Sequence, residues 1–138
     1  MSTRHSIVDY ALQRRALLAR VRAGHAGTFD VCDAHPYLQR AAQYHGEPTE
    51  ATCPICRKEQ LTLVHYVYGD DLRHISGQAK KPVEIERLAA AHREFTVYAV
   101  EVCRSCGWNF LTRSYVLGDV PKPDAAPRPA RRRRAAQD

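Results

Sequence analysis

Two pairs of cysteines carry the clearest chemistry in this sequence: Cys53 with Cys56, and Cys103 with Cys106. In each pair two residues separate the cysteines, so that one tight turn can aim both sulfurs at the same point. Four thiolates are the ligand set of a tetrahedral structural zinc ion. We therefore predict that the four cysteines together bind one Zn²⁺, which serves as a structural cofactor.

Two other roles are open to the same cysteines. A single C-x-x-C also occurs as a redox dithiol, but that role calls for a βαβ context and leaves the second pair without a function. Disulfides form in oxidising compartments, and the polar, then amphipathic start of the chain does not read as a secretory signal. Zinc is therefore the preferred prediction, with a reduced, cytoplasmic protein as the expected setting.

The elements that must position the cysteines read as strands. Residues 60–68 and 95–102 are rich in β-branched and aromatic side chains, and residues 108–117 leave the second pair in the same way. Residues 57–102, between the two pairs, number 46, far more than the ~15–20 of a compact four-cysteine site. This stretch must contain an insertion, for which the apolar pattern of residues 82–93 predicts a helix. The predicted fold class is α+β: N-terminal helices plus a three-stranded antiparallel zinc ribbon with a helical insertion between its first and second strands.

The N-terminal region reads as helical. Ser6 could cap a helix over residues 6–23, which Gly24 would end, and Pro36 suits the first turn of a second helix over residues 36–44. Arg14, Arg15 and Arg22 lie on or beside the apolar face of the first helix. They can extend along the edges of an ordinary docking helix, or they can present positive charge to phosphate or to an acidic protein surface.

A fifth cysteine, Cys32, stands three residues before His35. This C-x-x-H spacing could bind a metal, but a complete site would need two further ligands from scattered histidines. A buried free cysteine beside the start of a helix is the preferred interpretation.

Half of the net charge of +6 belongs to the last 20 residues and half to the rest of the chain. Residues 119–138 contain six basic and three acidic residues, and the remaining chain contains 15 basic and 12 acidic ones. From Pro121 onward the tail lacks aromatic and aliphatic anchors, and it is expected to be disordered. Its run of arginines offers phosphate contacts of low specificity: Arg131, Arg132, Arg133 and Arg134. The predicted organisation is a helical region over residues 1–50, the ribbon with its insertion over 51–118, and the tail over 119–138.

Several sequence strings resemble a family of small actinobacterial proteins of unknown function. They are VCDA at residues 31–34, PYL at 36–38, HGEP at 45–48, CPICRKEQL at 53–61 and SYVLG at 114–118. The resemblance covers most of residues 1–118 and implies no activity. The predicted ribbon is also similar to the zinc ribbons of transcription and translation proteins, which is an analogy of fold alone.

Three functions are compatible with these features. The first is a non-catalytic module whose basic and aromatic residues bind nucleic acid or a nucleic-acid machine. The second is a protein–protein adaptor in which zinc only stabilises the fold. The third, an enzyme, is disfavoured, because four cysteines fill the zinc coordination sphere and the sequence shows no catalytic motif. We expect neither a membrane span nor a small-molecule substrate.

Overall fold

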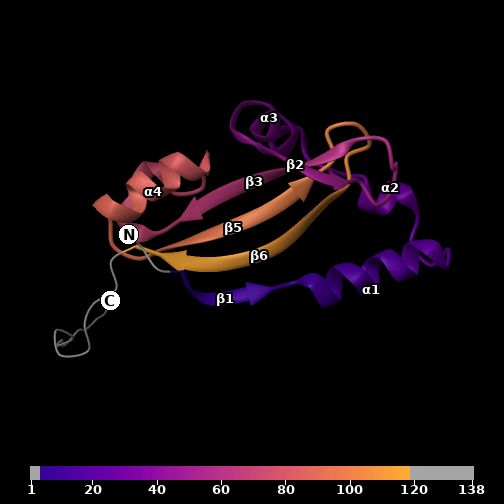
Figure 1. The fold of residues 1–138 in the computed structure, drawn as a ribbon, viewed down its shortest axis with the longest axis horizontal. Coiled ribbons are helices and arrows are strands. Elements are labelled where there is room, and N and C mark those ends of the chain that lie inside the picture. Colours follow the sequence, from indigo (N-terminus) through magenta and orange to yellow (C-terminus); the bar gives the residue numbers. More distant parts are fainter. Residues whose placement is uncertain (1–3, 119–138) are drawn as a thin grey trace.

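The computed structural model describes residues 4–118, which fold around one antiparallel sheet of six strands (Figure 1). The strand order is β1-β6-β5-β3-β2, and the short strand β4 also pairs with β3. The strands are β1 (His5–Asp9), β2 (Glu47–Thr52), β3 (Gln60–Tyr68), β4 (Ala79–Lys80), β5 (Phe95–Val102) and β6 (Asn109–Leu117). The helices are α1 (Ala11–Arg22), α2 (Thr28–Val31), α3 (Pro36–His45) and α4 (Pro82–Ala91), with a 3₁₀ turn, η1 (Asp70–Ile75).

The centre of the sheet confirms the three predicted strands. β3 pairs antiparallel with β5 from Thr62 opposite Val102 to Tyr68 opposite Thr96, and β5 pairs antiparallel with β6. The predicted helix in the insertion is α4, between β3 and β5. The sheet nevertheless has six strands rather than three, so the N-terminal region contributes strands as well as helices.

The start of the chain corrects the prediction of a helix over residues 6–23. Residues 5–9 form β1 on the outer edge of β6, where His5 lies opposite Val116 and Asp9 opposite Arg113. Five residues are too few for a hydrophobic period to separate helix from strand, and the free edge of β6 satisfies their backbone groups. Helix α1 starts only at Ala11, whose backbone N–H donates to the Asp9 carboxylate. It ends as predicted, at Gly24 with its positive φ of 80°.

β2 is a second strand that was not predicted from the sequence. It pairs with β3, with Glu47 opposite Leu63 and Thr52 opposite Gln60. Its sequence, EPTEAT, contains a proline and two glutamates, which are uncommon in strands. Pro48 is tolerated because β2 is an edge strand. The expected boundary between residues 50 and 51 falls inside this strand.

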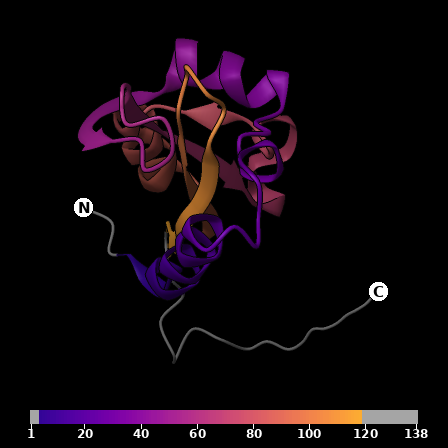
Figure 2. The ribbon, with the colours of Figure 1, turned by 90° about the vertical axis from the view of Figure 1, so that its right-hand side faces the viewer.

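Side chains alternate between the two faces of the sheet. On what we call the α1/α4 face, Val97 and Tyr115 pack against Ile85 of α4, and Trp108 packs with Leu18 of α1. On the opposite, α3 face, Val64 and Val102 pack against Ala42 of α3. Figure 2 shows α1 and α3 on opposite sides of the sheet. The predicted tail, including its arginines, lies outside the described residues. Among residues 4–118, no helix is long and apolar enough to cross a bilayer.

Candidate metal centre

The four predicted cysteines meet at one end of the sheet. Their sulfur atoms all lie within 4.8 Å of one another. The Sγ atoms of Cys53 and Cys106 are 3.7 Å apart, and those of Cys56 and Cys103 are 3.6 Å apart. A tetrahedral zinc ion with Zn–S bonds of about 2.3 Å requires sulfur–sulfur distances of about 3.8 Å, whereas a disulfide requires about 2.05 Å. The four cysteines are thus positioned to bind a metal ion, and none of them is joined in a disulfide among residues 4–118.

Two equivalent turns present the cysteines, and we call them the first knuckle (residues 53–59) and the second knuckle (residues 103–108). In the first, the N–H of Cys53 donates to the carbonyl of Glu59 at 2.8 Å; in the second, the N–H of Cys103 donates to the carbonyl of Trp108 at 2.8 Å. The first knuckle leads directly into β3, and the second joins β5 to β6. In Figure 1 the knuckles are the magenta and orange loops at the right-hand end of the sheet.

Backbone N–H groups point at the sulfurs and stabilise their thiolate forms. The N–H of Ile55 donates to Cys53 Sγ, that of Cys106 to Cys103 Sγ, and that of Trp108 to Cys106 Sγ, over 3.3–3.4 Å. Such contacts around the ligands fix the sulfur positions and favour metal binding. The second knuckle therefore holds its sulfurs in place through its own backbone.

The thiols differ in acidity when no metal is bound. Burial raises the pKa of Cys53 and of Cys106 to about 12. The backbone N–H groups of Lys58 and Glu59 instead lower the pKa of Cys56 to about 7. Since a metal binds thiolates, its binding releases the protons of the buried thiols, and acid competes with the metal. Metal affinity should therefore decrease as the pH falls.

Cys32 lies beside the centre, a position that the sequence did not predict. Its Sγ is 3.4 Å from Cys106 Sγ, and it can donate a hydrogen bond to that sulfur. Burial raises the pKa of Cys32, which favours the protonated donor. The neighbouring His35 does not join it, because its Nδ1 accepts the backbone N–H of Tyr37 and caps α3. Cys32 thus contacts a ligand without belonging to the cluster of four, and it is half-buried rather than buried.

A polar triad connects the metal centre to α1. The indole N–H of Trp108, which is fully buried, donates to the Glu101 carboxylate at 2.7 Å. The Arg14 guanidinium donates to the same carboxylate oxygen at 2.8 Å. Phe110 stacks on the Trp108 ring at 6.0 Å between centroids, and both pack with the cysteines of the cluster. Leu111 lies on the opposite, α3 face. The Arg14 side chain is therefore held against Glu101 and is part-buried, whereas Arg15 and Arg22 are exposed.

Replacing Gly107 by alanine should destabilise the second knuckle. Gly107 has a φ of 91°, and an added Cβ would lie 3.0 Å from the carbonyl oxygen of Cys32. Backbone strain of this kind costs about 1–3 kcal/mol, and the contact adds to it. Urea unfolding of the metal-loaded protein measures the loss.

Gly24→Ala is the matched control, because Gly24 also has a positive φ but nothing lies within 4 Å of its Cβ position. This variant should lose stability only through the strain of its backbone. Equal losses for the two variants would show that the approach of the Cys32 segment to the second knuckle does not matter.

The fold and the site define a class of protein: an α+β domain with an antiparallel sheet and a four-cysteine cluster at one end of it. The chain belongs to the Family of unknown function (DUF5318), whose profile matches residues 1–133.

Its relatives include two mycobacterial proteins. "Uncharacterized protein Rv0049" of Mycobacterium tuberculosis and "Uncharacterized protein Mb0050" of Mycobacterium bovis are each 54% identical over 124 residues, which cover 90% of this chain and 85% of the relative. The comparison confirms the resemblance noted in the sequence. No solved structure matches the chain.

Proposed function

We propose that this protein is a non-catalytic zinc-binding module that holds single-stranded nucleic acid on the α3 face of its sheet. Zinc is the metal that best suits four thiolates in a tetrahedron. Two knuckles at one end of an antiparallel sheet support a zinc-ribbon arrangement. Four protein ligands leave no coordination position for water or substrate, which supports a structural role for the metal.

One observation carries the nucleic-acid proposal: an aromatic surface on the α3 face, which we call the tyrosine surface. It consists of two adjoining hollows of about 350 and 470 Å³ that share Tyr66. The first lies against α3 and the second over β3, β5 and β6. Together they are lined by five tyrosines: Tyr37, Tyr44, Tyr66, Tyr68 and Tyr98.

The tyrosine surface is open and rigid enough for bases to stack on it. The exposed fractions of Tyr37, Tyr44 and Tyr68 are 71, 60 and 46%, large values for aromatic residues. Tyr68 and Tyr98 meet edge to face, with ring centroids 5.4 Å apart. Bases of any sequence can stack on such rings, which suits binding without sequence preference.

The charges around the tyrosine surface favour a polyanion. Arg40, His45 and Lys80 line the hollow against α3, and among residues 4–118 no carboxylate lines either hollow. Arg40 also lies over the ring of Tyr37, with its guanidinium carbon 5.8 Å from the centroid. Arginine and lysine beside stacking rings can contact the phosphates that link successive bases. A protein adaptor function is the alternative, and the basic side chains that line the hollow against α3 favour nucleic acid over it.

Removing tyrosines from the tyrosine surface should weaken binding to single-stranded oligonucleotides. We expect Tyr68→Ala and Tyr98→Ala each to lower the affinity about tenfold, since a stacked base contributes about 1–3 kcal/mol. Arg40→Gln should instead reduce the slope of affinity against salt concentration by about one contact. Fluorescence anisotropy with labelled oligouridine and oligothymidine, using the full zinc-loaded chain, measures both effects.

Phe29→Ala provides the control, because Phe29 is 93% exposed but lies in α2 near the metal centre. It should bind as the parent protein does. If the tyrosine variants also bind unchanged, the contacts come from other arginines and the tyrosine surface is not the site. If the parent protein binds no oligonucleotide at low salt, the adaptor function replaces this proposal.

A further inference from the structure

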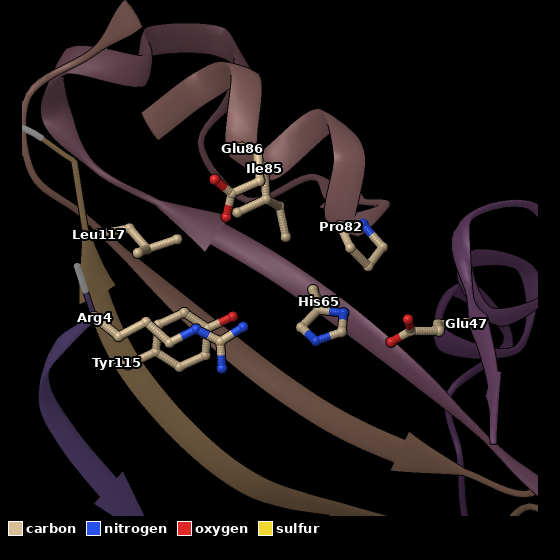
Figure 3. A pocket seen from close by; sticks show the side chains of 8 residues that line it. All are labelled: Arg4, Glu47, His65, Pro82, Ile85, Glu86, Tyr115 and Leu117. Atoms are coloured by element: carbon tan, nitrogen blue, oxygen red, sulfur yellow. The ribbon is translucent and has the colours of Figure 1, made fainter. Parts of the chain in front are cut away.

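A second, smaller pocket lies on the opposite, α1/α4 face, between α4 and the sheet (Figure 3). Its volume is about 150 Å³. The walls come from distant parts of the chain: Arg4 before β1, Glu47 of β2, His65 of β3, Glu86 of α4 and Tyr115 of β6. Pro82, Ile85 and Leu117 add apolar surface. The pocket is separate from the metal centre and shares no residue with the tyrosine surface.

His65 gives this pocket an unusual polar group. Its exposed fraction is only 8%, and its Nδ1 atom forms no hydrogen bond within residues 4–118. Burial lowers the pKa of His65, which keeps the imidazole neutral at neutral pH. Buried polar atoms in folded proteins almost always have a partner, and polar groups left without one mark sites of binding or strain.

The charged groups of the pocket stand on separate walls. The guanidinium of Arg4 rests on the ring of Tyr115, 4.3 Å from its centroid, and Figure 3 shows Glu47 and Glu86 on two other sides. Within residues 4–118, none of these three charged side chains is in an ion pair. Arg113 is near enough to influence both His65 and Tyr115. The pocket is thus lined by one positive and two negative side chains, which stand apart from one another.

We propose that this pocket binds a small zwitterion of the α-amino acid class. The carboxylate of such a ligand would pair with Arg4 and the Tyr115 hydroxyl, and its ammonium group with Glu47 or Glu86. A short apolar side chain would contact Ile85 and Leu117. A cavity of about 150 Å³ accommodates a molecule the size of benzene, and L-alanine has about as many heavy atoms. Because the walls carry charges of both signs, they favour a ligand with both signs over a simple anion or cation.

The test uses the full zinc-loaded chain and three matched probes: L-alanine, propionate, which lacks the ammonium group, and ethylamine, which lacks the carboxylate. NMR of the Ile85 and Leu117 methyl groups reports binding at the pocket itself. We expect L-alanine to shift these signals in a saturable way and the other two probes to bind at least about tenfold more weakly, since each loses a charge-assisted contact.

Arg4→Gln and Glu86→Gln should each weaken L-alanine binding about tenfold. Arg20→Gln and Glu50→Gln change the same residue types at exposed positions outside the pocket and should leave binding unchanged. Propionate or ethylamine binding as tightly as L-alanine would overturn the proposal, and so would methyl signals that none of the three probes shifts. Oligonucleotide binding at the tyrosine surface is measured separately, so either proposal can fail without the other.

Discussion

Replacing Cys103 by serine should remove the metal and unfold the metal end of the sheet. Cys103 is fully buried and joins β5 to the second knuckle. Serine does not supply the thiolate that zinc requires, and the remaining three cysteines cannot close the tetrahedron. Structural zinc contributes about 10–16 kcal/mol of apparent binding free energy in zinc-finger peptides, more than the whole stability of a typical small domain. Elemental analysis should show about one zinc per chain in the parent protein and almost none in the variant, and thermal unfolding should lose its cooperative transition.

Cys32→Ser is the matched control, since Cys32 contacts Cys106 but lies outside the cluster of four. It should keep its zinc and most of its stability, whereas Cys53→Ser should behave like Cys103→Ser. Zinc lost from Cys32→Ser would overturn the assignment of the ligands. Freshly purified, reduced parent protein without zinc would overturn the assignment of the metal.

Replacing Glu101 by alanine should strongly destabilise the protein. Its carboxylate accepts hydrogen bonds from Trp108 and Arg14, and its side chain is only 11% exposed. Alanine leaves the buried indole N–H and a part-buried guanidinium without their partner. Breaking a buried pair in this way costs about 3–5 kcal/mol, and partial exposure of Arg14 brings the expected loss to the lower end. Urea unfolding with zinc present measures it.

Replacing Arg14 together with Glu101 should recover part of the lost stability, because the unpaired charge is then removed as well. In the double variant Glu101→Leu with Arg14→Met, no guanidinium is left without a partner, so it should be more stable than Glu101→Leu alone. Arg15→Ala, at an exposed position of the same helix, should change the stability little. A loss for Glu101→Ala no larger than for Arg15→Ala would show that the triad does not hold α1 on the sheet.

The metal ligands and the central strands were predictable because their signals are local. Two C-x-x-C spacings identify four ligands, and a run such as Gln60–Tyr68 has the composition of a strand wherever it lies. The insertion helix was predictable for the same reason: Pro82 starts it, and Ile85, Leu88 and Ala89 recur at helical spacing. In each case the residues that determine the element lie within the element.

The edge strands and the pockets were not predictable because they depend on distant partners. β1 is a strand only because β6 offers an open edge, and the sequence of residues 5–9 does not indicate that this edge is available. Cys32 reaches Cys106 across 74 positions of sequence, and Arg14 reaches Glu101 across 87. Tyr66 and Tyr68 share a face because they are two residues apart on β3, but no spacing links them to the tyrosines of α3 and β5.

The pairing of β1 with β6 has a consequence for the order of folding. The first strand of the chain can pair only after the last strand has been made, because His5 lies opposite Val116. The knuckles likewise meet only after the 46 residues between them have been made and their loop has closed. A chain synthesised from its N-terminus therefore cannot complete either the sheet or the cluster of four sulfurs until nearly all of residues 4–118 has emerged from the ribosome. Contacts of such long range slow folding, and they make metal capture one of its final steps.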